Sequence, residues 1–320
     1  MGDSKSYINV RNIISIIIIG FALLLIFTPD IESLEKLRYL NSYFMLGFLA
    51  LAMLMLFLSE KRLMFASITA CALLCIFLKS VSNQHIVLPE INDLADIKLV
   101  HFNLGNFEGH PDSVLKLINT TDADLISFQE FTPSWDNYFK NKIGQWFDYF
   151  SKDVRIDPYG MCIFSNFPIK NASIYYANDI PNFKSEIIID GKTRFNLFSS
   201  YVLPPFQQKE TDQTKEHLNQ IANRIEKANY PALIFGDFNM VYWSDELIHF
   251  RSKLGLLNSR RDANISLVSQ SFDHIFYSDE LECTSFDEIL DSNGKHIGIK
   301  GVYQIKKTDE EMKKTILSIR

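Results

Sequence analysis

The sequence has little cysteine, no block of basic residues and no internal repeat. Of its four cysteines, Cys71 and Cys75 lie together in an apolar segment, whereas Cys162 and Cys283 lie far apart in the later chain. This distribution excludes a disulfide framework. The net charge of -6 comes without a Lys/Arg block, so the strong electrostatic footprint of a nucleic-acid binder is missing. A dedicated nuclease is therefore disfavoured, although nuclease activity is not excluded.

Charge is also absent from three long apolar runs near the start of the chain. These runs are residues 13–27, 43–58 and 63–78. With its uncharged flanks, each approaches the roughly 20 residues that cross a bilayer. We predict a membrane anchor of residues 1–80 with three transmembrane helices. The predicted helices cover residues 12–28, 42–58 and 62–78.

A cleaved secretory signal is the alternative interpretation of the first run, because Lys5 and Arg11 precede it. Pro29 and Asp30 follow where small residues of a cleavage site would be expected, so we favour an uncleaved anchor. Three spans place the two ends of the chain on opposite sides of a membrane. With the basic start inside, the chain after Lys79 of this multi-pass protein, including residues 96–320, lies outside the cytoplasm.

After a polar linker at 81–95, residues 96–320 alternate short apolar runs with polar stretches and form the second predicted domain. The predicted strands are 97–104, 124–130, 161–166, 185–190, 194–202, 232–237, 271–278 and 296–305. The predicted helices are 112–120, 209–227 and 244–255. Many strands with intermittent helices indicate a layered α/β fold.

Polar side chains occur where several of these strands end. The stretch PALIFGDFNM is an apolar run that finishes in Asp237 and Asn239, two positions apart and therefore on one side of a strand. The other strand ends carry Asn103 and Asn106, Gln129 and Glu130, Asp273 and His274, and Lys295 and His296. Each alone fits a turn residue, a solvated strand end or a satisfied core histidine. Together they indicate a polar site at one edge of a sheet.

The order of the motifs is specific. Along the chain come NLGN, ISFQE, MCIFSNFPI, SSYVLPP, IFGDFN, SFDHIF and GKHIGI. This order resembles the endonuclease/exonuclease/phosphatase superfamily over roughly residues 97–305. The resemblance implies a four-layered α/β sandwich of two packed mixed β-sheets flanked by helices, here preceded by three transmembrane helices. The membrane region resembles that of a membrane-anchored bacterial subgroup.

The resemblance also implies roles for individual residues. Glu130 would bind Mg²⁺ or Mn²⁺ with help from Asn103, because hard divalent cations prefer oxygen ligands. Asp237 would orient and deprotonate the attacking water, and Asn239 would fix that carboxylate. His296, paired with Asp273, would donate to the phosphoryl group or the leaving oxygen.

Two positions depart from the family pattern. Tyr201 stands where histidine is frequent, and it can still donate to a phosphate oxygen. Lys295 replaces an aspartate next to His296, which changes the charge beside the metal. The nearest carboxylate, Asp291, is four residues earlier in the chain.

The leading hypothesis is a membrane-anchored, metal-dependent phosphoesterase acting on a phosphodiester or phosphomonoester, with a lipid-linked or membrane-proximal ester as the favoured substrate. The alternatives are a nuclease on the secreted side and a non-catalytic relative that binds a phosphorylated ligand, for which Lys295 is the argument. Substrate specificity is expected in the loops at 176–184 and 257–270, which carry no readable signature.

Overall fold

The computed structural model describes residues 3–29, 31–83, 96–107, 111–140, 142–191, 193–204, 208–260, 271–291 and 293–306. Most of the predicted linker, from residue 84 onward, lies outside the described residues. So do residues 261–270 of one expected specificity loop and the chain after residue 306.

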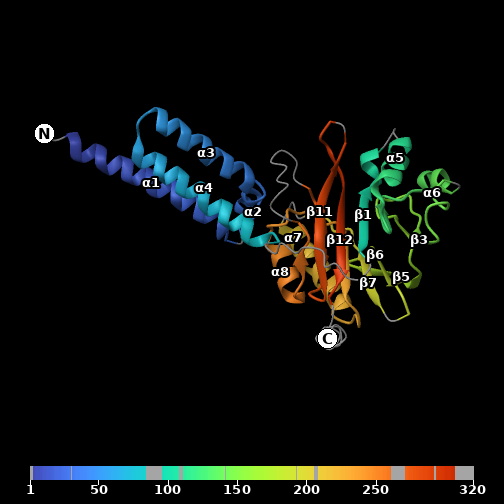
Figure 1. Cartoon of the computed structure of the whole chain (residues 1–320). Helices are drawn as coiled ribbons and strands as arrows, with labels where there is room; N and C mark the ends of the chain where they lie inside the picture. Colours follow the sequence, from blue (N-terminus) through green and yellow to red (C-terminus); the bar gives the residue numbers. More distant parts are fainter. Residues whose placement is uncertain are drawn as a thin grey trace, which may run out of the picture.

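Four helices form the first part of the chain and extend to one side of the rest (Figure 1). They are α1 (Asp3–Ile26), α2 (Glu32–Arg38), α3 (Asn41–Phe57) and α4 (Lys61–Val81). Helices α1, α3 and α4 pack around a small apolar core that includes Ala22, Phe48 and Leu74. Their long apolar runs contain no proline and suit helices, and charged residues are confined to their ends.

One of these helices is long and apolar enough to cross a membrane by length and composition. It is α4, whereas the apolar helical stretches Val10–Ile26 and Asn41–Phe57 are shorter. All three predicted spans coincide with helices, but within the described residues only the third meets the length criterion. The uncharged residues that flank the first two apolar runs do not make these stretches long enough to meet the criterion.

After these four helices, the described strands form two mixed six-stranded sheets. The first has the order β11-β12-β1-β2-β4-β3 and the second has the order β5-β6-β7-β8-β10-β9. The strands of the first sheet are β1 (Ile97–Asn103), β2 (Leu125–Gln129), β3 (Tyr149–Asp153), β4 (Met161–Ser165), β11 (Leu281–Leu290) and β12 (His296–Ile305). Those of the second are β5 (Ile169–Ala177), β6 (Ile180–Ile188), β7 (Arg194–Ser199), β8 (Ala232–Asp237), β9 (Leu257–Asn258) and β10 (Asp273–Tyr277).

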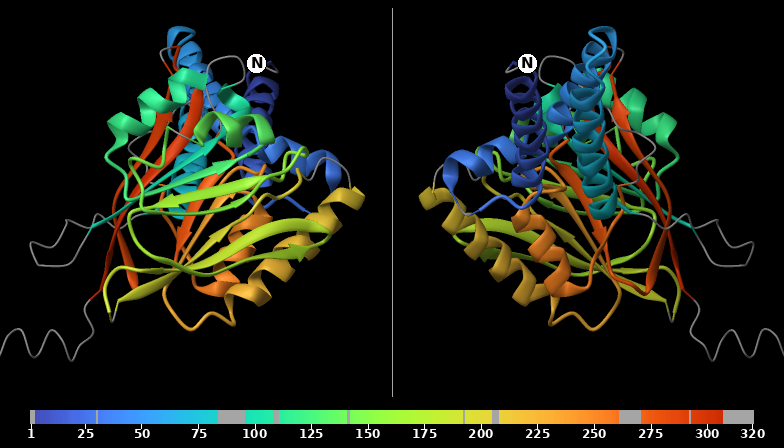
Figure 2. Two further views of the ribbon diagram at one scale, coloured as in Figure 1. Left: turned by 90° about the vertical axis from the view of Figure 1, so that its right-hand side faces the viewer. Right: turned by 90° about the vertical axis from the view of Figure 1, so that its left-hand side faces the viewer.

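The sheets pack face to face, and helices cover their outer faces (Figure 2). The first sheet is covered by α5 (Pro111–Thr121) and α6 (Pro133–Phe139), and the second by α7 (Gln208–Ile225) and α8 (Asp245–Leu254). Buried side chains such as Leu99, Phe235 and Ile299 fill the space between the sheets. This arrangement is the four-layered α/β sandwich that the family resemblance implies.

The eight predicted strands all exist, and they are the eight interior strands of the two sheets. Strand β6 begins at Ile180, five residues before its predicted start. The four strands that sequence reasoning missed, β3, β5, β9 and β11, are the four edge strands. An edge strand is half solvated, and it need not carry the apolar run by which interior strands are found. Helices α2 and α6 are single short helices and were missed as well.

The helical region is joined to the sandwich by specific contacts. Leu78 of α4 packs against Val241 and Trp243, which follow β8. The indole Nε1–H of Trp243 donates to the carbonyl of Arg38 at 2.8 Å. The Arg38 guanidinium also pairs with Asp245 at the start of α8. The segment after β8 therefore connects the sheet edge to α2 and α4.

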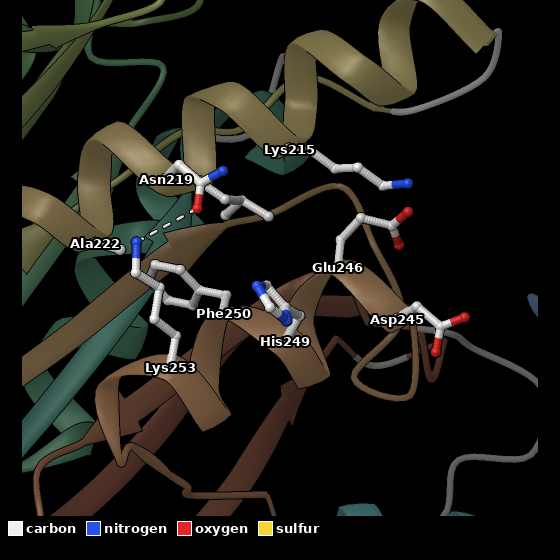
Figure 3. Close-up of a pocket in the computed structure, with 9 residues that line it drawn as sticks. Lys215, Asn219, Ala222, Asp245, Glu246, His249, Phe250 and Lys253 are labelled. Carbon is white, nitrogen blue, oxygen red and sulfur yellow. Dashed lines mark hydrogen bonds between the residues drawn. The ribbon is translucent and has the colours of Figure 1, made fainter. Parts of the chain in front are cut away.

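A groove between α7 and α8 forms a cavity of about 210 Å³ on the outer face of the second sheet (Figure 3). Leu218, Ala222 and Phe250 line its apolar part. Lys253 closes one end, where its ammonium donates to the side chains of Asn219 and Asn223. None of the polar strand-end residues lines this groove.

Candidate active site

The polar strand ends meet at one edge of the sandwich. Strands β1 and β2 are parallel, and Asn103 lies opposite Gln129 at their carboxyl ends. In the second sheet Asp273 opens β10 directly opposite Asp237 at the end of β8, because these two strands are antiparallel. His296 opens β12, which is antiparallel to β1. The predicted site residues therefore come together from both sheets.

The GDFN segment turns sharply at the end of β8. Gly236 has φ of +140°, and a Cβ there would lie 2.0 Å from the Ser200 carbonyl oxygen. Only glycine fits this position. Asn239 has φ of +52°, and its backbone N–H donates to Asp237 Oδ1 at 2.9 Å. Its side-chain amide donates to the carbonyl of Val202 at 3.0 Å, so Asn239 fixes the turn that holds Asp237.

Asn103 and Glu130 form a direct pair. Asn103 Nδ2 donates to Glu130 Oε1 at 3.0 Å, and Asn103 Oδ1 accepts the N–H of Gly105 at 2.9 Å. Glu130 has φ of +58°, an uncommon conformation for a residue other than glycine and one that clusters at functional sites. A Cβ on Gly105 would lie 2.5 Å from Glu130 Oε2, so the carboxylate packs over bare backbone.

Asp273 and His296 form the second pair of the site. His296 Nε2 donates to Asp273 Oδ2 at 2.7 Å, and both side chains are nearly buried. Burial opposes ionisation of Asp273, but the hydrogen bond from His296 and the neighbouring histidines outweigh it and lower the pKa of this carboxyl. His274, which follows Asp273, points elsewhere. Its Nε2 bonds the carbonyl of Met240 at 2.7 Å, as expected of a satisfied core histidine.

Tyr201 and Lys295, the two departures from the family pattern, lie in different surroundings. Tyr201 is half-buried against the ring of Tyr159. Burial and the nearby Asp237 carboxylate raise the pKa of its hydroxyl. Lys295 is exposed, and its backbone closes the hairpin with Asp291: the Lys295 N–H donates to Asp291 Oδ1 at 2.8 Å. Within the described chain, the Lys295 ammonium makes no hydrogen bond or ion pair with the site.

The site carries excess negative charge. Burial and the Asp273 carboxylate raise the pKa of Asp237 to about 7, and Glu130 adds to the effect. Among the described residues, no lysine or arginine pairs with Glu130 or Asp237. A cation next to Glu130 would offset this repulsion, and the oxygens of Glu130 and Asn103 are of the kind that Mg²⁺ prefers. The described residues contain no cluster of three or more His, Cys, Asp or Glu ligands. The donor set therefore fits a hard cation held by one carboxylate, one amide and water.

Sequence reasoning named Gln129 among the polar strand ends but assigned it no role in the site. Gln129 is fully buried and links the two sheets. Its Nε2 donates to the Ser200 carbonyl at 2.8 Å, and its Oε1 accepts the N–H of Asp237 at 2.9 Å. The available signal was its position two residues after Ser127, on the inward face of a buried strand.

A buried ion pair behind His296 was also missed. Arg260 pairs with Glu288, and Glu288 Oε2 lies 4.0 Å from His296 Nδ1. Arg260 also donates to the carbonyl of Asp273 at 3.3 Å. Arg260 follows β9 and Glu288 lies on β11. Both are edge strands that were not predicted from the sequence, so the positions of these two residues could not be predicted either.

The comparison with known proteins decides the family. Residues 100–295 match the sequence model of the Endonuclease/Exonuclease/phosphatase family. The chain belongs to this family. By family it is a metal-dependent phosphoesterase, a hydrolase of phosphoric esters. No curated protein matches the sequence.

Several solved structures share the fold at low sequence identity. An endonuclease/exonuclease/phosphatase family protein from Bacteroides thetaiotaomicron is 15% identical with a TM-score of 0.55, over 66% of this chain and 96% of the other. D. rerio TDP2 complexed with a single-strand DNA product is 14% identical with a TM-score of 0.53, over 65% and 99%. The human Nocturnin catalytic domain with a bound sulfate is 15% identical with a TM-score of 0.51, over 66% and 95%.

Proposed function

We propose that the protein is a membrane-anchored phosphoesterase that hydrolyses a phosphodiester or phosphomonoester with Mg²⁺ or Mn²⁺. The observation that carries the proposal is the convergence of Asn103, Glu130, Asp237, Asn239 and the Asp273–His296 pair at one edge of the sandwich. A non-catalytic relative would not require the uncommon backbone conformation of Glu130. It would also not require an Asp237 carboxyl whose pKa is raised by burial and by neighbouring carboxylates.

The residues divide the work of phosphoryl transfer. Glu130 and Asn103 would hold the divalent cation, which when bound supplies positive charge toward the phosphoryl oxygens. Asp237 would accept the proton of the attacking water. Its pKa of about 7 without a cation suits a base near neutral pH, and its carboxylate is oriented by the Asn239 backbone.

Two further residues would act on the phosphate oxygens. Asp273 occupies Nε2 of His296, which leaves Nδ1 as the ring nitrogen without a hydrogen bond in the described chain. Nδ1 is buried and lies 4.0 Å from Glu288 Oε2, so a donation from His296 to the phosphate or the leaving oxygen would have to come from Nε2, in exchange for its bond to Asp273. The half-buried Tyr201 hydroxyl, near Asp237, would donate to a second phosphate oxygen. The exposed Lys295 lies outside this set, which weakens the case for a phosphate-binding protein without activity.

We also propose that residues 1–80 anchor the enzyme as a multi-pass protein of a membrane-anchored bacterial subgroup, with residues 96–320 as a catalytic domain outside the cytoplasm. The support is the outward apolar surface of α1, α3 and α4, on which Ile17, Phe57 and Ile76 are well exposed. An anchor confines the site near the bilayer and favours a lipid-linked or membrane-proximal ester. Protease added to intact spheroplasts should remove residues 96–320 under this proposal.

A nuclease is the second candidate, because one structural neighbour, D. rerio TDP2, is complexed with a single-strand DNA product. The net charge of -6 and the absence of a basic block count against an extended polynucleotide as the main substrate. Plasmid and single-stranded DNA therefore belong in the substrate panel.

The test is hydrolysis of bis(p-nitrophenyl) phosphate and p-nitrophenyl phosphate by the full chain in detergent, with Mg²⁺, with Mn²⁺ and with EDTA. Turnover should require the metal, and Asp237→Asn should lower it by about a thousandfold because the site loses its proton acceptor. Glu130→Gln should raise the Mg²⁺ concentration that is needed. The matched control is Asp279→Asn, the same change at an exposed carboxylate on the opposite sheet edge. Equal rates in wild type and Asp237→Asn would refute the proposal.

A further inference from the structure

A second cavity, of about 410 Å³, adjoins the candidate active site. Glu130 forms part of its wall, so the proposed metal ligand and the cavity share one carboxylate. The 3-10 helix η1 (Leu104–Phe107) forms one wall, and α6 forms the other. A phosphate ester bound at Glu130 and Asp237 would therefore have one substituent next to this cavity.

The lining of the cavity is mainly apolar and aromatic. Trp135 and Tyr138 are three residues apart and share one face of α6, with ring centroids 5.9 Å apart at an interplanar angle of 86°. Leu104 and Phe107 form a buried floor opposite them. The Tyr138 ring is held from outside, because its hydroxyl donates to Asp112 and the Lys142 ammonium lies 3.6 Å from its centroid. Rings at right angles offer both a face and an edge to a third ring.

The described side chains of the cavity favour a neutral occupant over an anionic one. Among the described residues that line it, there is no lysine or arginine, and its one charged group is the Glu130 carboxylate. A second phosphate of a polynucleotide or a pyrophosphate would find no cationic side chain among these lining residues. The volume suits a group of one or two rings rather than a long chain.

We propose that this cavity binds a neutral, planar aromatic substituent of the phosphoester substrate. The inference rests on the proposed function for the position of the phosphate and adds the chemical class of the group attached to it. Trp135 and Tyr138 would be specificity-determining residues that contact this ring.

The test compares phenylphosphonate with methylphosphonate as ligands of the full chain in detergent with Mg²⁺, by calorimetry and by competition against bis(p-nitrophenyl) phosphate. The two probes carry the same anionic group and differ in the ring. Phenylphosphonate should bind about tenfold more tightly, as expected for one buried aromatic contact. In Trp135→Ala, which removes a wall, the ratio should fall toward one.

A second variant keeps the test valid if Trp135→Ala fails to fold. Ser134 is an exposed residue of the cavity rim, so Ser134→Trp should fold and fill the space, which also removes the preference. Ser134→Ala and Trp146→Phe are the matched controls and should keep it. Equal binding of both phosphonates by the wild type, or a preference that survives Ser134→Trp, overturns the proposal.

The outcomes also separate this inference from the proposed function. Hydrolysis of bis(p-nitrophenyl) phosphate without any ring preference would uphold the phosphoesterase and refute the aromatic subsite. A ring preference abolished by Ser134→Trp, in a protein that hydrolyses nothing, would support the subsite and refute the activity.

Discussion

The helical region and the sandwich have opposite surfaces. In the helices, Phe57 is 83% exposed and Ile76 is 66% exposed, and the apolar core between them is small. In the sandwich, apolar side chains such as Phe235 are fully buried between layers. Water is therefore a suitable solvent for the outer face of one region only. Under the proposed membrane anchor, lipid would cover the exposed apolar side chains of the first region.

Membrane retention is the test of this contrast with the largest expected effect. We expect the full chain to stay in the membrane fraction after a carbonate wash, because apolar side chains such as Ile17, Phe57 and Ile76 are exposed on α1, α3 and α4. Ile76→Lys should reduce retention, since a charge on a lipid-facing helix costs about 2.5 to 3.5 kcal/mol. The matched control is Ile156→Lys, which changes a residue of the sandwich that is 92% exposed. Release of the wild type by carbonate would contradict the anchor.

Some charged side chains inside the sandwich are buried as pairs, as in Asp273 with His296. The strongest case is Arg260 with Glu288, both with side chains about a tenth exposed or less. Glu288→Gln leaves the guanidinium without its counter-charge, and we expect the unfolding free energy to fall by about 3 kcal/mol. Chemical denaturation in detergent would measure it. Glu282→Gln on the same strand is the control, and a similar small loss in both variants would show that the ion pair is of little importance.

The histidines should make the two regions differ in pH dependence. Residues 3–83 contain no histidine. In the sandwich, burial lowers the pKa of His217 to about 4 and that of His274 to about 3. The unfolded chain takes up these protons near pH 6.5 and the folded chain does not. Stability should therefore be full above pH 6.5 and fall as the pH drops toward 4, by up to about 1.4 kcal/mol per pH unit for each histidine.

Denaturation of the full chain at several pH values would measure this slope. His217→Gln should flatten the slope between pH 6.5 and 4, and the same change at the exposed His249 should not. A slope that is unchanged in His217→Gln would show that this histidine is not the source.

Burial also explains which parts of the fold could be predicted from the sequence. The eight interior strands were found because a strand buried on both faces must be an apolar run, as in Leu233, Ile234 and Phe235 of β8. Edge strands such as β11, with the sequence LECTSFDEIL, carry polar residues toward solvent and gave no such signal. The predicted site residues do meet: pairing brings the strand ends together within each sheet, and the packing of the two sheets brings the two groups together. Their catalytic roles remain predictions.

What sequence reasoning could not supply depends on contacts between sheets. Gln129 reaches Ser200 and Asp237 across the core, and Arg260 reaches Glu288 on another edge strand. No local spacing encodes these pairs, because their partners are set by how two sheets pack. The aromatic cavity beside Glu130 is of the same kind, since α6 was not predicted and its two rings face a separate segment.

The smallest expected effect lies at the junction of the two regions. Trp243 follows the active-site turn, packs against Leu78 and donates its indole N–H to the Arg38 carbonyl at 2.8 Å. Trp243→Phe keeps the ring and removes this one donor, so the free energy of unfolding should fall by about 1 kcal/mol. In a chain that begins at residue 84 the carbonyl is absent, and the same substitution should then cost almost nothing. Trp146→Phe, a matched change away from the junction, should behave alike in both chains. If Trp243→Phe were equally destabilising with and without the helices, the indole would act within the sandwich alone, and the helical region would be a tether rather than a support for the turn that holds Asp237.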